Sequence, residues 1–594
     1  MKTLCTFLLW TAAMLSHAQP RTASDGVYVL NEDWFGVNNS TLNFWNRKEG
    51  TIDYRIIKDA NRQPSSGNVN ALGCTATYAQ IYGGKLYAMS KQDQDSGEKS
   101  FQGGRFVIVN LDDMKVEHGF RTISTTASGV SFADGRACLV VSPHKVYLGT
   151  SNGIYIYDAD RQTISATPIE GTENELATGG ESAAQGMGAL YNNQIGNMIR
   201  GQDYVFAVKQ DCGILVIDAV DDHVLTVIPG CFSAMVQSAD GAIWAGMNTA
   251  TGVDADGNRL NHYPYGSSAG EGWKGNALLR IDQYSLETTT VELTAGGIPQ
   301  SWYAWTAGSF AAHPSKNVLY YVYSDPSIGQ SSWFSAGALY RYDIDADVQE
   351  KVCDISDYGI HFYSSGVRVN PVDELLYGFY YSGGIANDAW SYFTIEDDGS
   401  DELTTDNERP LIANYWYPSL VVVPDTEAPV VQTPERLTID GEALTIDLAA
   451  LVDDADTPKA SIVKQITNVA DAGIVRASLV RGNLLVEGLK AGRTTVTVAY
   501  DAAGQFAEVT FDVDVVTPSG VTATESEKAA LRYANGSLYA TTAGRLQVYS
   551  ASGNLLMSAA VVPSTPISVA HLTGIVMVKY MTNEQTYSYK LMLK

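Results

Sequence analysis

Positive charge is scarce in this chain. Its 594 residues include 39 Lys and Arg against 66 Asp and Glu, which gives a net charge of −27. A surface this acidic repels polyanions, so the composition argues against nucleic-acid binding and against docking to anionic membranes as main functions.

Cysteines and long apolar runs are also few. Of the six cysteines, Cys5 lies in the leader, and the other five form no CxxC pair and no cluster with histidine. Their spacing predicts neither a zinc site nor a disulfide framework. We expect buried thiols, with one or two bridges as the alternative. No run of about 18 apolar residues follows the leader, so no membrane-spanning helix is predicted.

Residues 1–18 have the composition of a secretory signal. Lys2 supplies the positive start, Leu4–Leu15 is apolar, and Ser16-His17-Ala18 places small residues before a cleavage point at Gln19. This pattern predicts export from the cytoplasm.

Catalytic motifs are absent or lack their structural context. Residues 266–270 spell the Gly-x-Ser-x-Gly nucleophile elbow, and residues 270–275 spell a dinucleotide fingerprint. Neither is flanked by the strand and helix that its chemistry needs. Residues 254–258 alternate carboxylates as calcium loops do, but lack the bidentate Glu of such loops. We therefore predict no enzyme activity, no cofactor and no catalytic metal. The alternative is a hydrolase or lyase whose catalytic residues follow none of these motifs.

Strand-forming residues, in contrast, are abundant and repeat. A short apolar strand ends in Asn, Asp or Glu at intervals of 48 to 64 residues, at Asn46, Asn110, Asp158, Asp218, Asp282, Asp343 and Glu396. A second strand precedes each one, as in GVYVLNE from Gly26. Seven such units predict an all-β fold, with a seven-bladed β-propeller over residues 24–424.

The first unit begins directly with its second strand, so its innermost strand is missing. The segment SLVVV, Ser419–Val423, stands at the far end of the repeat and predicts that strand. One blade is then built from both ends of the repeat, which removes an open sheet edge.

Two further β modules follow the repeat. Residues 428–516 alternate in short strands, which predicts an Ig-like or cadherin-like sandwich. Asp453, Asp454, Asp456 and Asp501 in this module are either solvated turn residues or calcium ligands. Residues 528–594 predict a small C-terminal sandwich.

The last module resembles the C-terminal sorting domain of type IX secretion cargo. The resemblance rests on Tyr549, Gly553, Leu572, Gly574, Lys590 and Lys594. It implies export across the outer membrane and attachment to the surface of a Gram-negative cell. The alternative is another small adhesive sandwich.

Aromatic residues gather in the loops that a propeller places on one face. These loops join second to third strands or enter innermost strands, and several are long, as binding loops often are. Rings there suit a sugar or a tetrapyrrole. The alternative for any single ring is packing of the loop itself. The predicted ligand-binding residues are Trp34, Phe35, Tyr263, Trp273, Trp302, Tyr303, Trp305, Trp333, Phe334, Phe362, Tyr363, Trp390, Tyr415 and Trp416.

Polar side chains share these loops and can bond amide or hydroxyl edges of a ligand. Among cations only Lys91 and Lys274 are expected there, so a strongly anionic ligand is not predicted. The expected polar residues are Glu32, Asp33, Asn38, Asn39, Asp325, Gln330 and Asp388.

The opening GVYVLNEDWFGVNNSTLNFWN resembles a family of secreted propellers. The matching residues are Val29, Leu30, Asn31, Glu32, Gly36, Asn38, Asn39, Ser40 and Leu42. That family includes surface corrinoid-binding (vitamin B12-binding) proteins that partner outer-membrane transporters. The resemblance implies a cell-surface propeller that captures a corrinoid or related tetrapyrrole for such a transporter. The alternative function is adhesion to a glycan or a protein through the same face.

Overall fold

The chain is all-β over the part that the computed structural model describes. That part is residues 20–593 without 63–66, 94–96, 125–132, 175–192, 211, 248–276, 296–297, 299–308, 323–336, 383–388, 520–530, 535–536, 541, 551–553, 564, 570–571, 573 and 583–585. The predicted signal sequence lies outside it.

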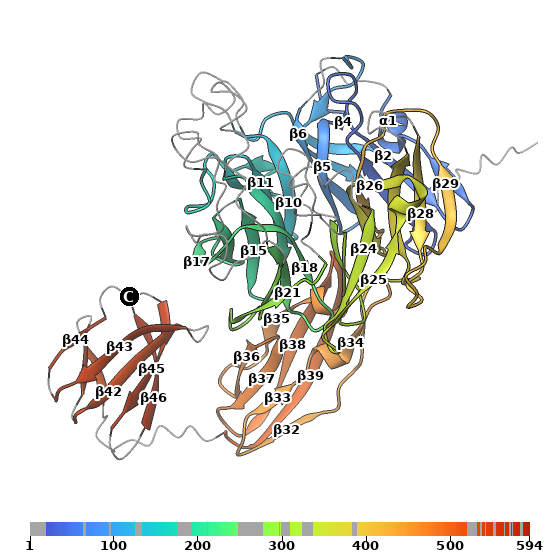
Figure 1. The fold of residues 1–594 in the computed structure, drawn as a ribbon. Coiled ribbons are helices and arrows are strands. Elements are labelled where there is room, and N and C mark those ends of the chain that lie inside the picture. The colour runs from blue at the N-terminus through green and yellow to red at the C-terminus, as the bar shows by residue number, and fades with distance from the viewer. Residues whose placement is uncertain are drawn as a thin grey trace, which may run out of the picture.

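The predicted repeat forms four-stranded antiparallel sheets, seven of them within the described residues (Figure 1). The first sheet has the order β3 (Thr51–Asp53), β2 (Thr41–Asn46), β1 (Gly26–Asn31) and β30 (Pro418–Val422). The second has the order β5 (Cys74–Tyr82), β6 (Lys85–Gln92), β8 (Phe106–Asn110) and β9 (Val116–Phe120). The third has the order β10 (Gly135–Ser142), β11 (Lys145–Thr150), β12 (Gly153–Asp158) and β13 (Thr163–Ile164). The next two are β14 (Ile195–Arg200), β15 (Tyr204–Lys209), β16 (Gly213–Asp218) and β17 (Val224–Pro229); β18 (Phe232–Gln237), β19 (Ile243–Met247), β20 (Ala277–Ile281) and β21 (Thr288–Glu292). The last two are β22 (Phe310–Ala312), β23 (Val318–Val322), β24 (Ala338–Asp343) and β25 (Val348–Asp354); β26 (Ile360–Val369), β27 (Leu376–Ser382), β28 (Trp390–Ile395) and β29 (Thr405–Pro410).

The sheets form a ring. Their innermost strands contact one another in the cyclic order β30, β5, β10, β14, β18, β22, β26 and back to β30. This is the arrangement of blades in a β-propeller. Short elements lie in the connections: α1 (Ile56–Ala60), the two-stranded pair β4 (Ala71–Leu72) and β7 (Gly103–Gly104), and the 3-10 turn η5 (Ile355–Tyr358).

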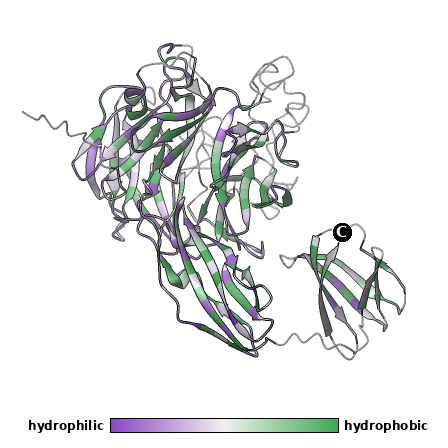
Figure 2. Cartoon of the chain, turned by 180° about the vertical axis from the view of Figure 1, so that it is seen from behind, coloured by the Kyte–Doolittle hydropathy of each residue, from purple (hydrophilic) through white to green (hydrophobic). Residues whose placement is uncertain are grey.

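The two ends of the repeat meet in one sheet, as the sequence predicts. β30 pairs antiparallel with β1, with Tyr28 opposite Val422 and Leu30 opposite Leu420. Alternate residues of β1 face opposite sides. Tyr28 and Leu30 pack toward the sheet of β5, whereas Val27 and Val29 pack toward the sheet of β27. Both faces of the strand are therefore buried, and Figure 2 shows hydrophobic residues along such strands.

A second group of strands follows the ring. One sheet has the order β32 (Leu437–Asp440), β39 (Gln505–Thr517), β38 (Gly492–Ala502), β35 (Val463–Val469), and the other β33 (Leu444–Ile446), β37 (Asn483–Gly488), β36 (Val475–Val480). They enclose one apolar core. Beside them lie the pair β31 (Val430–Val431) and β34 (Val452–Asp453), and the turns η6 (Ala449–Leu451) and η7 (Lys459–Ser461). We call residues 430–517 the sandwich.

Residues 531–593 form the third group around a core of their own. Its sheets are β43 (Leu555–Val561), β42 (Gly544–Ser550), β45 (Gly574–Met581), β46 (Thr586–Leu593), and β40 (Leu531–Ala534), β41 (Ser537–Ala540), β44 (Ile567–Ser568).

The sandwich contacts one face of the ring, which we call the covered face. This face carries the tight connections between first and second strands, at residues 83–84, 201–203 and 238–241. Tyr82 donates a hydrogen bond of 2.7 Å to Asp501, and Gln202 both donates to and accepts from the backbone of Lys464. A cavity of about 330 Å³ is lined by innermost strands and by sandwich residues, so the sandwich lies over this end of the central channel.

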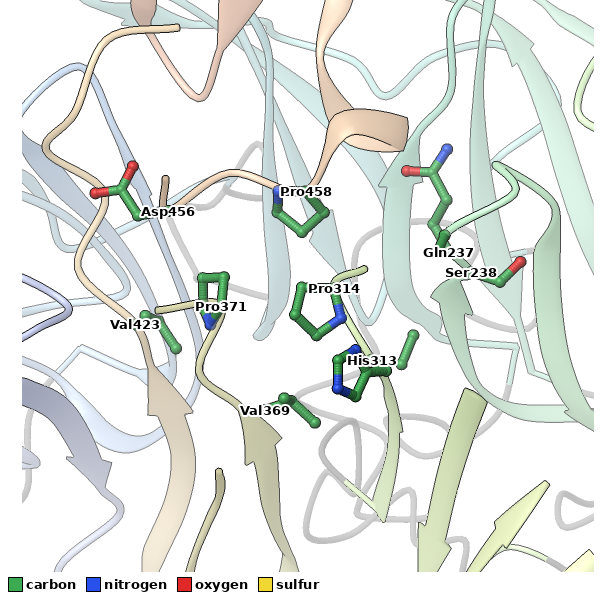
Figure 3. A pocket seen from close by; sticks show the side chains of 11 residues that line it. Gln237, Ser238, His313, Pro314, Val369, Pro371, Val423, Asp456 and Pro458 are labelled. Atoms are coloured by element: carbon green, nitrogen blue, oxygen red, sulfur yellow. The ribbon is translucent and has the colours of Figure 1, made fainter. Parts of the chain in front are cut away.

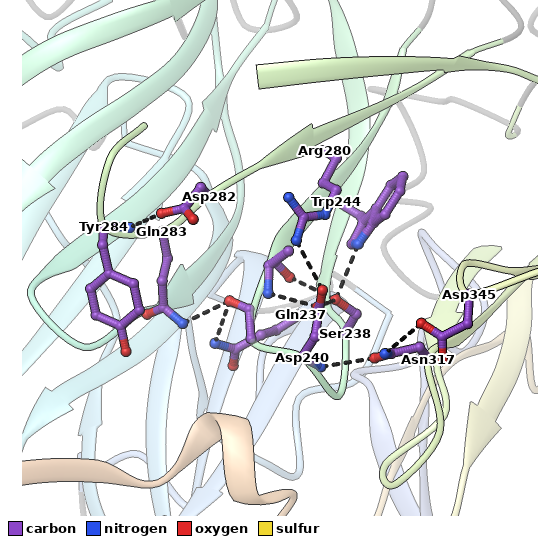
Figure 4. Close-up of polar contacts among 12 residues, drawn as sticks. Gln237, Ser238, Asp240, Trp244, Arg280, Asp282, Gln283, Tyr284, Asn317 and Asp345 are labelled. Atoms are coloured by element: carbon purple, nitrogen blue, oxygen red, sulfur yellow. Dashed lines mark hydrogen bonds and ion pairs between the residues drawn. The ribbon is translucent and has the colours of Figure 1, made fainter. Parts of the chain in front are cut away.

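Turns on the covered face are tied to their neighbours by polar side chains (Figure 4). Asp240 accepts from Arg280 at 2.9 Å, and its backbone N–H donates to Asn317. Gln283 donates to the carbonyl of Gly241 at 2.7 Å. These bonds link successive strand connections beneath the sandwich.

All five cysteines after the leader are thiols, as expected, and four of them are buried. Within the described residues, no helix has the length and apolarity that crossing a membrane requires.

Candidate ligand-binding face

The opposite side of the ring, which we call the open face, carries the loops 32–40 and 411–417. These loops hold four of the predicted ligand-binding residues, Trp34, Phe35, Tyr415 and Trp416, and three more, Phe362, Tyr363 and Trp390, lie in the strands β26 and β28. The other seven, Tyr263, Trp273, Trp302, Tyr303, Trp305, Trp333 and Phe334, lie outside the described residues, as do Lys274, Asp325, Gln330 and Asp388. For these the assignment stays a prediction.

Trp34 and Phe35 present large apolar surfaces to solvent. Their side chains are 42% and 58% exposed. The ring of Trp34 lies against Tyr415, with centroids 4.2 Å apart and planes tilted by 39°. The two rings come from opposite ends of the repeat and form one aromatic surface, which we call the aromatic pair.

Four predicted ligand contacts are instead buried. Phe362, Tyr363, Trp390 and Trp416 are at most 3% exposed and pack among other rings. Tyr363 meets Trp390 edge-on at 5.5 Å, and both contact Tyr417, which stacks on Tyr415. A ring without an open surface cannot stack on a ligand. Tyr363, Trp390 and Trp416 support the loops that carry the aromatic pair, and Phe362 packs on Phe393 in the core.

The loop 32–40 is fixed by its backbone. The N–H groups of Glu32 and Asp33 donate to the carbonyls of Tyr417 and Trp416 at 2.9 and 3.0 Å. Asp33 adopts a left-handed conformation with φ 55°, and Gly36 has φ 87°. These two residues turn the chain sharply, so that Trp34 and Phe35 reach solvent while Glu32 and Asp33 stay buried.

Asp33 is a buried carboxylate beside the aromatic pair. It accepts a 2.5 Å hydrogen bond from Thr41 and a 3.3 Å bond from Asn414. Burial raises its pKa to about 7, although the charges of Lys58 and Arg55 act in the opposite direction.

Glu32 and Lys91 are two further buried ionisable residues, and their charges interact. Burial raises the pKa of Glu32, and the charge of Lys91 and a hydrogen bond from Tyr363 oppose that rise. Burial also lowers the pKa of Lys91, and Arg136 adds to this effect. One carboxylate oxygen of Glu32 is buried without a hydrogen-bond partner in the described part of the chain. Both side chains therefore lie beneath the open face and are not part of its exposed surface.

A cavity of about 490 Å³ opens beside Asp33. Its lining residues are Asp33, Asn38, Arg55, Lys58, Asp59, Arg62, Glu98, Phe101 and Asn414. Lys58 donates to Glu98 at 2.8 Å and to the carbonyl of Asn39 at 2.7 Å, and its ammonium lies 5.7 Å from the ring centre of Phe101. The guanidinium of Arg55 lies 4.8 Å over the ring of Trp416.

The expectation of few cations on this face is therefore wrong for the described loops. α1 and its flanks bring Arg55, Lys58 and Arg62 to the cavity. These residues lie in the connection that enters the innermost strand β5. The sequence pattern places connections that enter innermost strands on this face. Candidate residues there were selected by their aromatic rings, so these three cations were missed.

Comparison with family models gives one match. Residues 25–424 match the family described as "Domain of unknown function (DUF5074)". The chain belongs to this family. The match covers the ring from the start of β1 to the end of β30. No curated protein matches.

Solved structures resemble this family member only distantly. A quinonprotein alcohol dehydrogenase-like protein from Bacteroides thetaiotaomicron shares 13% identity over 68% of this chain and 79% of its own, with a TM-score of 0.43. A lignostilbene dioxygenase from Pseudomonas brassicacearum shares 10% over 68% and 93%, with a TM-score of 0.36. The extracellular domain of a putative one component system from B. thetaiotaomicron shares 9% over 82% and 62%, with a TM-score of 0.30.

Proposed function

We propose that this protein is a cell-surface, seven-bladed propeller that binds a corrinoid or related tetrapyrrole on its open face and passes it to an outer-membrane transporter. The observation that carries the proposal is the aromatic pair, in which the exposed ring of Trp34 lies on the half-buried Tyr415, beside a cavity lined by charged side chains. An exposed aromatic surface next to a polar hollow is typical of a binding site.

The chemistry of the face suits a ligand with a flat ring and a polar edge. The aromatic pair offers stacking area, and the side-chain amide of Asn38 in the adjoining cavity can bond an amide of the ligand. Arg55 suits one anionic group at the far end of the ligand, whereas Lys58 and Arg62 already pair with Glu98 and Asp59. Cobalamin combines an amide-rimmed macrocycle with a single phosphate diester, so its parts correspond to these three features. We propose binding without turnover.

Titration calorimetry of the mature chain with cyanocobalamin tests the proposal. We expect one-to-one binding that Trp34→Ala weakens at least tenfold, because the exposed ring supplies the stacking surface. Phe506→Ala is the matched control, since Phe506 is an equally exposed ring in the sandwich. Absence of heat at a hundredfold ligand excess would refute corrinoid binding.

Glycan adhesion is the second candidate, and the aromatic pair also favours it, because tilted exposed rings accept the apolar faces of sugars. Haem and a panel of oligosaccharides are titrated alongside cobalamin. A glycan that binds tightly, with sensitivity to Trp34→Ala, would replace the tetrapyrrole as the ligand.

The other modules fit a surface protein. We propose that residues 1–18 are a signal peptide, that the sandwich is an Ig-like domain, and that residues 528–594 are a type IX sorting domain. Tyr549 and Gly574 of the sorting pattern lie in the paired strands β42 and β45. Mass spectrometry of the protein from the cell surface would show loss of both ends. An intact C-terminus on surface protein would contradict the sorting assignment.

A further inference from the structure

Three aspartates lie where the chain passes from the ring to the sandwich. Asp425 follows β30 in the linker, and Asp454 and Asp456 follow β34 in the sandwich. Figure 3 shows Asp456 near the linker residue Val423, beside a cavity of about 180 Å³. The three carboxylates belong to the joint between the two parts and take no part in the open face.

Each carboxylate is fixed through one of its two oxygens. Asp425 Oδ2 accepts from the hydroxyl of Thr457 at 2.5 Å. Asp454 Oδ1 accepts from the backbone N–H groups of Asp456 and Thr457 at 2.9 and 2.7 Å. Asp456 Oδ2 accepts from the N–H groups of Thr426 and Glu427 at 2.8 and 3.2 Å. The linker and the sandwich loop thus hold the side chains in place from both sides.

The other three oxygens have no donor. Asp425 Oδ1, Asp454 Oδ2 and Asp456 Oδ1 are buried and make no hydrogen bond within the described residues. Asp425 and Asp456 are only 9% and 5% exposed. Burial, followed by the charges of Asp456 and Asp454, raises the pKa of Asp425 to about 8. Buried carboxylate oxygens without donors are costly, and nearby negative charge adds to the cost.

We propose that a calcium ion binds between these three free oxygens and links the linker to the sandwich. Ca²⁺ prefers carboxylate and carbonyl oxygens and takes six to eight of them, so water and backbone carbonyls would complete its shell. The absence of Cys or His from the trio disfavours a softer metal. Among the described residues no three such side chains are already gathered as a finished metal site. We therefore expect the ion to draw the three carboxylates closer together.

Thermal unfolding of the full mature chain, in EDTA and in about 5 mM CaCl₂, tests this site. That concentration exceeds the dissociation constants of roughly 10⁻⁴–10⁻³ M found for extracellular calcium modules. We expect calcium to raise the Tm by roughly 2–4 °C and to slow proteolysis of the linker at residues 423–429. Mg²⁺ at the same concentration should act less, because it gives up its water reluctantly.

Two variants test whether the change in Tm comes from calcium binding at these aspartates. Asp425→Asn and Asp456→Asn remove a negative charge but keep an oxygen acceptor, so in EDTA we expect each to melt at or above the wild-type temperature. Neither should respond to calcium. Asp453→Asn is the matched control, because Asp453 is a neighbouring aspartate whose side chain is 77% exposed. It should keep the wild-type response.

Two results would overturn the site. One is a wild-type Tm and linker cleavage rate that calcium leaves unchanged. The other is a calcium response that survives in both Asp425→Asn and Asp456→Asn, which would place the ion elsewhere in the chain.

Discussion

The two faces of the ring satisfy their polar groups in different ways. On the covered face, bonds are made in matched pairs, as when Gln202 donates to Lys464 and accepts from it. On the open face, Glu32 and Asp33 are buried with raised pKa values, and Glu32 keeps an unpartnered oxygen. Reciprocal bonds of this kind are typical of a permanent contact within a protein, and the three unpartnered aspartate oxygens of the joint are the exception. The open face presents the exposed rings of Trp34 and Phe35 and a charged cavity, which a separate molecule can contact.

The largest loss of stability is expected at Trp416, in the loop that leads into β30 on the open face. Trp416→Ala removes a fully buried ring that stacks on Tyr54 at 5.3 Å and donates to the carbonyl of Ile412 at 2.9 Å. We expect the free energy of unfolding to fall by about 3–5 kcal/mol. Urea unfolding measures it, with Trp34→Ala as the exposed control that should cost less than about 1 kcal/mol. Equal losses in both variants would mean that Trp34 also supports the fold.

The Asp33→Asn variant tests the open face through the pH dependence of the unfolding free energy. The folded pKa of Asp33, about 7, lies above its ordinary value of 3.8. The folded state therefore holds the proton more tightly, so the stability from this group is complete below about pH 4 and is lost as pH rises through 7. We expect that loss to be roughly 2–4 kcal/mol by pH 8 in the wild type, and absent from Asp33→Asn.

Urea unfolding at pH 4, 6 and 8 tests this expectation. Asp357→Asn, at an exposed position in η5, is the control and should follow the wild-type pH profile. Parallel profiles for wild type and Asp33→Asn would show that Asp33 ionises normally.

On the covered face, Tyr82→Phe removes a single hydroxyl. Its 2.7 Å bond to Asp501 then leaves a largely buried carboxylate oxygen without its donor. We expect a loss of about 1–3 kcal/mol in the unfolding free energy, with ligand binding on the open face unchanged. Tyr358→Phe, at a 63% exposed residue, is the control. Weaker ligand binding in Tyr82→Phe would show that the two faces are coupled.

The smallest effect is expected for Arg481→Ala. Arg481 pairs with Asp282 at 2.7 Å across the same contact, but its side chain is 54% exposed. Exposed ion pairs contribute little, so we expect a loss below about 1 kcal/mol that shrinks further in high salt. Thermal unfolding at low and high salt measures it. A loss larger than that of Tyr82→Phe would reverse this ranking.

The fold was largely predictable because it depends on local patterns. Each second strand, such as GVYVLNE, has apolar residues on both faces, and the orphan segment SLVVV had one obvious place beside β1. The site was less predictable. Loop membership identified Trp34 and Tyr415 together with Trp390 and Trp416, but only the three-dimensional packing decides which rings reach solvent.

Two other features depended on distant contacts. The cations of α1 reach the open face because a five-residue helix turns them toward Asp33. The environment of Asp456 depends on a linker about thirty residues earlier in the chain. No short sequence window contains both partners of such a contact. The spacing of the aspartates alone therefore did not decide whether they are turn residues or calcium ligands.

The pairing of β1 with β30 also determines the order in which parts of the propeller can fold. The strand β1 is made first, yet its partner is completed only when residue 422 has been synthesised. Until then the ring has a gap, and β1 has one unpaired edge that is free to pair wrongly. Contacts this far apart in sequence form slowly. Closure of the ring is therefore expected to be a late step, and Trp34 and Tyr415 come together only when it is complete.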